Sequence, residues 1–218
     1  IKQKEFKPFG VSGTFSHIFI WENNRKDYSD NSARSGFYDT AYIDQNITFD
    51  SLSQRSLKNT VRFDFITDTT RKFRLGGGAG IRNEMFRYSQ IMPTFGDPAA
   101  DTSVWHRSSN ALIGRLYNDI GDKFRWSAMG ELYMNGHKAG DFNLKGELTK
   151  GFDWKRSRAD WIISGGIISS SPAFWHKQWG SNHFVWNNDF KKEFRINLGT
   201  DFSYPGRNIW LKADYAII

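Results

Sequence analysis

Charged side chains recur at every second position along much of this chain, with apolar or aromatic side chains between them. Lys191, Glu193 and Arg195 are typical, because basic and acidic residues follow one another on one parity. Rings of one sign would select ions, whereas near-equal numbers of both signs would not. We therefore expect either a weakly selective, water-filled pore or a lumen cross-linked by ion pairs and closed to solutes. The residues expected to line this lumen are Lys58, Arg62, Asp64, Arg74, Arg82, Glu84, Arg125, Glu131, Lys145, Glu147, Asp189, Lys191, Glu193, Arg195, Asp201, Lys212 and Asp214.

The histidines suggest a different chemistry, because a serine or carboxylate beside one of them could form an active site near one rim. His106, His137, His176 and His183 all have serines or aspartates nearby in the sequence. They are scattered, however, and the chain contains neither the Gly-x-Ser-x-Gly nor the His-Glu-x-x-His pattern. We therefore expect no catalytic residues and no enzyme.

The aspartates of the polar stretches are candidate calcium ligands, because calcium takes six to eight oxygen ligands. Their spacing does not match the EF-hand pattern, and the chain has no Cys for a thiolate metal site or a disulfide. We expect solvated loops, no metal and no cofactor. The aspartates concerned are Asp27, Asp30, Asp39, Asp44, Asp50, Asp97 and Asp101.

The formal net charge of +7 raises the question of a nucleic-acid partner. Such a partner would require lysines and arginines clustered on one face with stacking aromatics beside them. Here they are spread along the chain and interleaved with acids, so we expect no nucleic acid. Basic residues in the loops could instead meet anionic head groups. The expected partners are outer-membrane lipid and lipopolysaccharide, together with other outer-membrane proteins.

The alternation predicts β-strands with one apolar and one polar face, because successive side chains of a strand point to opposite faces. The segment from Phe184 to Tyr204 keeps this period throughout and predicts one strand longer than those of soluble domains. Together with it we expect nine strands in all. The others are predicted at 11–27, 57–65, 73–84, 111–119, 124–135, 142–149, 161–167 and 209–217.

The predicted connections alternate between short and long, as in outer-membrane barrels. Short turns are expected near 68–71, 121–123, 153–158 and 205–208, and longer segments near 28–56, 91–108, 136–140 and 173–182. Aromatic residues flank every short turn, which predicts a ring of them at a membrane interface. This girdle consists of Phe65, Phe73, Phe124, Trp126, Phe152, Trp154, Trp161, Phe202, Tyr204 and Trp210.

Composition favours the same fold class, an all-β antiparallel transmembrane barrel. Aromatic residues make up 17% of the chain although its hydrophobic fraction is 39%, as expected when alternate residues face lipid. A lipocalin-like soluble barrel or a β-sandwich would also alternate, with the apolar side facing a core. Strand length and the aromatic flanks favour the membrane. Since single-chain bacterial barrels have even strand numbers, we expect residues 1–218 to form one barrel segment that is incomplete at both ends.

Several strings resemble the putative porin family of Bacteroidota outer membranes. They are WENNRKDY at 21–28, GFY at 36–38, YID at 42–44, TDTTRKFRLGG at 67–77, SSPAFW at 170–175, WNNDF at 186–190 and LKADY at 211–215. The resemblance implies a location in the bacterial outer membrane and supplies no functional residues. The expected function is passive diffusion of small hydrophilic solutes. The alternative is a non-conducting structural or accessory barrel subunit of a larger outer-membrane complex for assembly, secretion or nutrient uptake.

Overall fold

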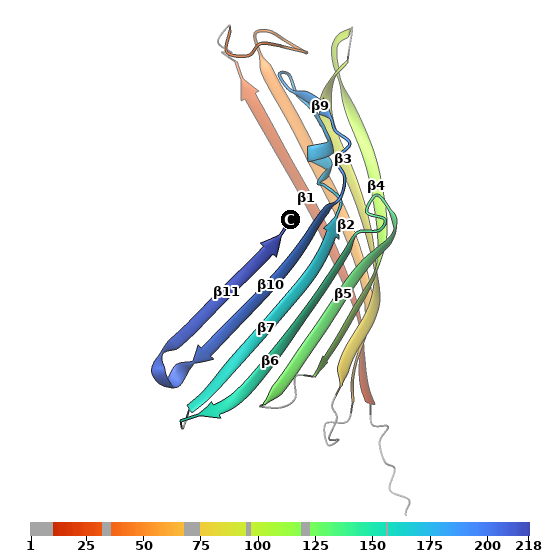
Figure 1. Ribbon diagram of the computed structural model, residues 1–218. Helices are drawn as coiled ribbons and strands as arrows, with labels where there is room; N and C mark the ends of the chain where they lie inside the picture. Colours follow the sequence, from red (N-terminus) through yellow and green to blue (C-terminus); the bar gives the residue numbers. More distant parts are fainter. Residues whose placement is uncertain (1–10, 32–35, 68–74, 95–96, 119–122, 156) are drawn as a thin grey trace, which may run out of the picture.

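The chain forms one large, curved antiparallel sheet, seen in the computed structural model of Figure 1. The structure describes residues 11–31, 36–67, 75–94, 97–118, 123–155 and 157–218. Nine strands hydrogen-bond in the order β1-β2-β3-β4-β5-β6-β7-β10-β11. Their bounds are β1 Val11–Asp30, β2 Thr48–Thr67, β3 Gly76–Thr94, β4 Asp97–Asn118, β5 Phe124–Gly136, β6 Phe142–Trp154, β7 Ser157–Ser170, β10 Glu193–Tyr204 and β11 Ile209–Ile217.

Every strand of this sheet pairs with its neighbour along the chain except across one insertion. Between β7 and β10 the chain forms the one-turn helix α1 (Phe174–Lys177) and a small hairpin of β8 (Gln178–Gly180) and β9 (Val185–Asn187). Strand β10 then returns to pair with β7. Within the described residues, one edge of β1 and one edge of β11 remain unpaired, so the sheet is an open trough.

The prediction of one long strand from Phe184 to Tyr204 is wrong for the first half of that segment. Strand β10 begins at Glu193, and the residues before it belong to the β8–β9 hairpin and an irregular segment. The polar run around Asn188 separates the two parts, because the Asn188 backbone N–H donates to the carbonyl of Lys177 at 2.6 Å rather than to a neighbouring strand. The alternating pattern is therefore shared by two elements that lie in different parts of the fold.

The structure also corrects the predictions of long loops near 91–108 and 28–56, because strands occupy much of both segments. Strand β3 continues to Thr94 and β4 begins at Asp97, with a 22-residue β4 in place of the expected loop and short strand. Strands β1 and β2 are each 20 residues long, and the connection between them shortens to 31–47. Pro93 did not prevent pairing in the β3–β4 hairpin, because it lies near the tip, where the strand register shifts between Met92 and Thr94.

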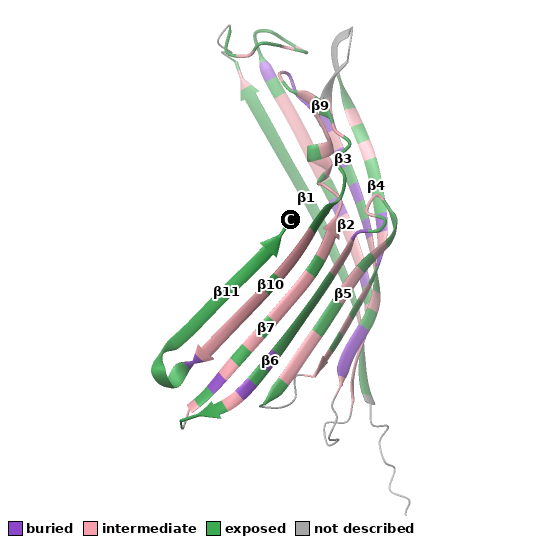
Figure 2. Cartoon of the chain, viewed as in Figure 1, coloured by how far each residue is buried: buried purple, intermediate pink, exposed green. Residues whose placement is uncertain are grey.

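The two faces of the sheet differ sharply in polarity. Side chains from strands that are not neighbours converge on the concave face, as Arg82 of β3 and Glu131 of β5 do. The register places the charged parity of every strand on this face and the apolar parity on the convex face. Figure 2 shows that exposed and partly exposed residues run along all the strands. Large convex side chains such as Phe63 (50% exposed) and Leu198 (55% exposed) are among them. The sheet is therefore polar inside and apolar outside.

The turn between β5 and β6 depends on a glycine. Gly136 has φ 80°, and a Cβ on it would lie 1.9 Å from the carbonyl oxygen of Ser108. A side chain there would be strained by the backbone and would also clash with β4. Gly136 thus lets this turn fold closely against β4, where His137 N–H donates to the same carbonyl at 3.1 Å. Among the described residues, no helix is long and apolar enough to cross a membrane.

Candidate functional site

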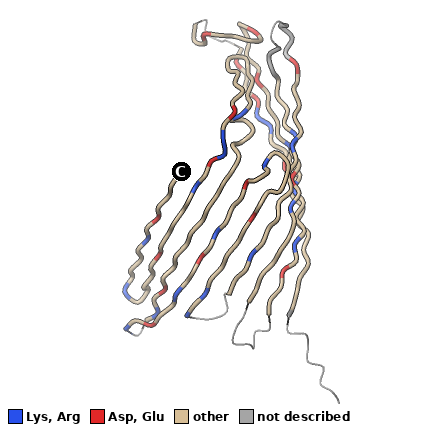
Figure 3. The backbone as a smooth tube through the Cα atoms, turned by 45° about the vertical axis from the view of Figure 1, so that its right-hand side comes forward, with Lys and Arg blue, Asp and Glu red and all other residues tan. Residues whose placement is uncertain are grey.

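The charged concave wall is the candidate site, and the strands place most of the predicted lumen residues on it. Lysines, arginines, aspartates and glutamates are mixed along the strands and are not segregated into opposite halves (Figure 3). The register assigns the following to the concave face: Lys58, Arg62, Asp64, Arg82, Glu84, Arg125, Glu131, Lys145, Glu147, Glu193, Arg195, Asp201, Lys212 and Asp214.

Three predicted residues are not on this wall or cannot be placed on it. Lys191 and Asp189 belong to the irregular segment before β10, because that strand begins only at Glu193, so they are not wall positions. Arg74 lies outside the described residues. The parity used for the prediction matches the face given by the register wherever a strand is present, but at Asp189 and Lys191 the alternation continues into a connection.

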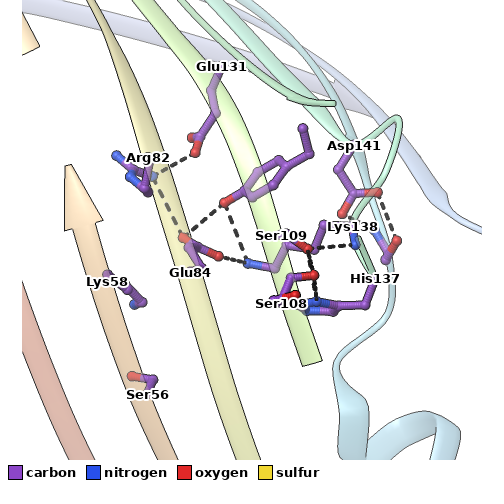
Figure 4. Close-up of polar contacts among 12 residues, drawn as sticks. Ser56, Lys58, Arg82, Glu84, Ser108, Ser109, Glu131, His137, Lys138 and Asp141 are labelled. Atoms are coloured by element: carbon purple, nitrogen blue, oxygen red, sulfur yellow. Dashed lines mark hydrogen bonds and ion pairs between the residues drawn. The ribbon is translucent and has the colours of Figure 1, made fainter. Parts of the chain in front are cut away.

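Glu84 is the centre of the tightest network on the wall (Figure 4). Its side chain is 3% exposed and forms an ion pair with Lys138 Nζ at 2.7 Å. Tyr133 Oη donates to the same carboxylate at 3.1 Å. Arg82 lies 3.9 Å from Glu84 and makes its closer ion pair, 2.6 Å, with Glu131. Strands β3 and β5 and the β5–β6 turn are therefore tied together across β4.

A second network surrounds Asp64 on β2. Arg62 lies at 2.6 Å on the same strand, and Arg115 reaches Asp64 from β4 at 3.0 Å. Strand β3 runs between them, and at the crossing point it carries Gly78. A Cβ on Gly78 would lie 2.2 Å from the Asp64 carboxylate. The glycine therefore leaves the space in which a charge-assisted bond spans two strands.

Ser109 and His137 form a hydroxyl–imidazole pair beside this wall. Ser109 Oγ lies 2.9 Å from His137 Nδ1 and 2.8 Å from the carbonyl oxygen of Ser108, to which it donates. Burial lowers the pKa of His137, which favours the neutral imidazole. Ser109 is fully buried, so its hydroxyl cannot reach a substrate. The pair therefore holds the β5–β6 turn on β4 and does not form a nucleophile.

Asp141 connects the same turn to the insertion between β7 and β10. Its carboxylate accepts hydrogen bonds from Ser171 N–H at 2.9 Å and Ser171 Oγ at 2.8 Å. Lys192 Nζ lies 2.9 Å from it and also donates to the Ala139 carbonyl. Both ends of the insertion are thereby fastened to one carboxylate. We call residues 171–192 the inner loop from here on.

The inner loop folds onto the concave face of β3 rather than away from the sheet (Figure 1). Gln90 of β3 is buried and exchanges two hydrogen bonds with the Gly180 backbone, one to its carbonyl and one from its N–H at 3.2 Å. Phe174 stacks on Tyr88 with ring centroids 4.0 Å apart. The loop therefore occupies part of the space enclosed by the trough.

Asn182 fixes the tip of the inner loop to the connection between β1 and β2. Its side-chain Oδ1 accepts from Ile43 N–H at 2.9 Å and Asp44 N–H at 3.0 Å, while Nδ2 donates to the Asp44 carbonyl at 2.7 Å. Its backbone N–H donates to Asp50 Oδ1 at 2.7 Å. The Asn182 side chain is 1% exposed. Since all its polar atoms are satisfied by protein, Asn182 specifies one docked position.

Part of the wall carries charges that have no partner. Within the described part of the chain, Arg125, Lys145 and Glu147 make no ion pair. Lys145 and Glu147 lie beside Ser164 and Asn197 in a hollow of about 500 Å³, where Gly166 and Gly199 contribute no side chains. The wall thus combines cross-linked charges on β2–β5 with free charges on β5–β6.

The predicted girdle residues mostly lie on the convex face near the ends of their strands at the short turns. The register places Phe65, Phe124, Trp126, Phe152, Trp154, Trp161, Phe202 and Tyr204 there. Trp154 and Tyr204 stack at 5.2 Å, and Tyr204 Oη donates to the Trp154 carbonyl at 2.9 Å. Phe73 lies outside the described residues.

Trp210 is a correction to the predicted girdle. It pairs with Ser203 and shares the parity of Lys212, so it belongs to the concave face. Aromatic residues were assigned to the girdle because they flank a turn, and this criterion does not distinguish the two faces of a strand. Ile209 has the convex parity at this end of β11.

The apolar surface on the convex face of the long strands has a limited height. Along β3 the convex residues change from Ile81 and Met85 to Arg87 and Ser89 towards the β3–β4 hairpin. The same change occurs on β2, where Arg55 and Ser53 lie beyond Leu57. At the same level of β3 as Arg87 and Ser89, Phe86 and Tyr88 lie on the concave face. The long strands therefore have an apolar band at one end and a polar extension at the other.

Among the described residues, no two of the four histidines considered for catalysis share a hydrogen bond or a ring contact, although His106 and His137 line the same cavity. His183 is held by Thr48 Oγ1 at 2.8 Å and the Thr40 carbonyl at 2.9 Å. His176 is in α1, and His106 has the convex parity of β4. The described residues contain no group of three His, Asp or Glu that could hold a metal ion. His137 and His183 therefore contribute to loop packing.

Several important residues were not singled out from the sequence. Tyr133, Lys138, Asp141, Asn182 and Lys192 hold the network and the inner loop, yet all but Tyr133 lie in connections, where alternation carries no information. Tyr133 was missed because it occupies a strand position where the alternation predicts a charged residue, so its aromatic ring was not considered part of the charged face. The polar residues beside the glycines of the 136–140 turn could have been predicted to make contacts, since tight turns often pack against a neighbouring strand.

Comparison with known proteins gives one match. The family model described as "Putative porin" matches residues 5–218, which is nearly the whole chain. No curated protein and no solved structure matches it.

Proposed function

The chain belongs to the putative porin family, and from this premise we propose that its sheet is part of the wall of an outer-membrane β-barrel. The apolar band would face lipid and the charged concave face would line a water-filled lumen. Small hydrophilic solutes would cross by passive diffusion, past the inner loop. We propose the outer membrane of a bacterium as the location, in Bacteroidota as the resemblance predicts.

The observation that carries this proposal is the polarity of the two faces. A soluble barrel or sandwich buries its apolar face, because exposed apolar area is unfavourable in water. Here the convex face exposes Phe15 (69%), Trp21 (63%) and Leu211 (63%), while ionisable side chains meet inside. Lipid would cover the convex face, and water would solvate the charges.

The open edges support further strands on both sides. In a membrane, unpaired N–H and C=O groups of β1 and β11 would each cost several kcal/mol. We propose that further strands cover both edges and close the barrel. Lipid and lipopolysaccharide would be its immediate surroundings. We propose no catalytic step for this protein, and alanine substitution of His106, His137, His176 and His183 would leave solute passage intact.

A non-conducting accessory barrel of a larger outer-membrane complex is the second candidate. The ion pairs of Glu84 and Asp64 and the docked inner loop favour it, because they fill and cross-link the interior. The free charges of Lys145 and Glu147 favour an open lumen instead. Conductance distinguishes the two candidates, since an accessory barrel with a filled interior would not conduct.

The test is single-channel conductance of the full-length protein in a planar bilayer. We expect stable ohmic steps, and Lys145→Glu should shift ion selectivity towards cations, because it reverses a lumen charge without breaking an ion pair. Lys150→Glu on the convex face is the control and should leave selectivity unchanged. Well-folded protein that gives no steps would overturn the diffusion proposal in favour of the accessory barrel.

A further inference from the structure

We infer that the cavity beneath the inner loop is a binding site for an acidic saccharide on its way through the lumen. This inference rests on the proposed function and adds a class of solute to it. The cavity has a volume of about 930 Å³ and is bounded by the inner loop, residues of β3 and β4, Gln54 of β2 and the β5–β6 turn. That volume suits a ligand of one to a few sugar rings.

Aromatic rings form one side of the cavity. Phe174 and Trp175 of the inner loop are half-exposed there. Phe174 stacks on Tyr88 of β3, and Tyr88 stacks in turn on Phe86 of the same strand. Trp175 meets the Phe174 ring edge-to-face at 4.9 Å and the Tyr88 ring at 5.4 Å, so its orientation is fixed. The electron-rich face of an aromatic ring attracts polarised C–H groups. A sugar ring presents such groups on one of its faces.

Amide side chains line the cavity as well. Within the described part of the chain, the side-chain amides of Gln54, Gln178 and Asn187 make no hydrogen bond, although all three line the cavity. Amide groups donate and accept together, which matches a hydroxyl group. Aromatic packing alone would not require amides here. Their presence beside the rings indicates a ligand that is apolar on one face and rich in hydroxyls at its edge.

The charges of the cavity favour a negative ligand. Arg107 and Lys177 line it, and among the described residues neither makes an ion pair. Lys138 also lines it, but Glu84 neutralises that charge at 2.7 Å. Asp189 is the acidic side chain of the lining. An arginine in this position suits a carboxylate or sulfate group, which accepts two parallel hydrogen bonds from a guanidinium.

The test measures block of the conducting full-length protein by an oligogalacturonate, with maltohexaose as the neutral counterpart. We expect oligogalacturonate to interrupt the current at concentrations at least tenfold lower than maltohexaose. Arg107→Gln should remove this difference, and Trp175→Phe, which retains a ring for packing, should weaken block by both sugars. The controls are Arg87→Gln and Trp161→Ala, which alter the same residue types on the convex face and should block as the parent does.

Direct binding separates this inference from the proposed pore. Titration of the detergent-solubilised protein with each sugar, followed by calorimetry, needs no conductance. Binding of oligogalacturonate that Arg107→Gln abolishes would support the site even in a silent barrel. Equal binding by parent, Arg107→Gln and Trp175→Phe, or no binding at all, would overturn it and leave the aromatic cluster as packing for the loop. Silence in the bilayer with intact binding would overturn the diffusion proposal alone.

Discussion

Glu84 shows how a single carboxylate organises one side of the concave wall. Lys138 and Tyr133 reach it from a turn and from a strand that does not neighbour β3, and Arg82 lies between it and Glu131. Its nearly complete burial distinguishes it from the other acids of the wall. A buried charge that loses its partner is costly, whereas an exposed pair contributes little. The stability of this wall should therefore depend on few of its many ion pairs.

Substitution of Glu84 by Gln tests this dependence. The amide can still accept from Tyr133, but Lys138 loses its counter-charge in a partly buried position. We expect a loss of about 1–3 kcal/mol in the free energy of unfolding, measured by urea denaturation of the protein folded in lipid vesicles.

Glu193→Gln is the matched control for that measurement. Glu193 pairs with Arg195 at 2.7 Å, but both side chains are more than 40% exposed, at 48% and 42%. Its loss should change stability by no more than about 0.5 kcal/mol. Equal effects of the two substitutions would show that burial of Glu84 does not matter.

The inner loop is the element on which the shape of the interior depends. It is fastened at its ends by Asp141, along its length by Gln90, and at its tip by Asn182. These contacts come from three separate parts of the chain. The loop is therefore held as a fixed partition in the trough, and its docking should be sensitive to the buried residue at its tip.

Asn182→Ala should release the tip of the inner loop. The substitution removes three hydrogen bonds of 3.0 Å or less between its side chain and the backbone of the β1–β2 connection. At about 1 kcal/mol each, docking would weaken by about 3 kcal/mol. We expect faster trypsin cleavage at Lys177 and larger conductance steps.

Asn46→Ala is the control for this release. Asn46 lies in the same connection, and within the described residues its side chain makes no hydrogen bond. Cleavage and conductance should match those of the parent. If Asn182→Ala behaves the same way, the tip is held by contacts other than the asparagine side chain.

The sequence predicted the sheet better than it predicted this loop, and the reason is physical. Alternation in segments such as 76–84 or Glu193–Tyr204 reports the two faces of a strand directly, so the parity of these strands and the charged face were predictable. The turns predicted near 68–71 and 121–123 lie largely outside the described residues. Alternation from Phe184 to Phe190 does not report the two faces of a strand of the large sheet, because these residues belong to the connection between β7 and β10. The bonds of Asn182 join residues more than 130 positions apart, and no local pattern specifies such a contact.

At the scale of the whole molecule, the height of the apolar band can be compared with the thickness of a bilayer, to find which part of each strand would face lipid and which part water. A strand crosses a bilayer with about 9–11 residues, so strands of 19–22 residues such as β3 and β4 would extend well beyond it. In the proposed barrel, the change from Met85 to Arg87 on the convex face of β3 would mark that limit. The extensions would stand in water on the side of the inner loop.

Two substitutions on β4 test the band. Leu112 and Val104 are both aliphatic, have the same convex parity, and are similarly exposed at 44% and 38%. Leu112→Arg, inside the band, should destabilise the protein in vesicles by about 2–4 kcal/mol. Val104→Arg, in the polar extension, should have little effect.

A soluble protein would show a different result, because both positions would then face water. The two variants would be equally stable, and the parent would fold without lipid or detergent. Either finding would contradict the membrane assignment while leaving the sheet and its register intact.

The anchoring of Asn182 by the β1–β2 connection also sets an order of events during biogenesis. The tip of the inner loop has no docking partner until residues 42–47 of the β1–β2 connection have taken their shape. Contacts of such long sequence separation form late, because the intervening chain must first be ordered. Until then the nascent wall encloses an undivided interior. An assembly intermediate would thus be leakier than the finished protein, and loop docking would be the step that ends this period of permeability.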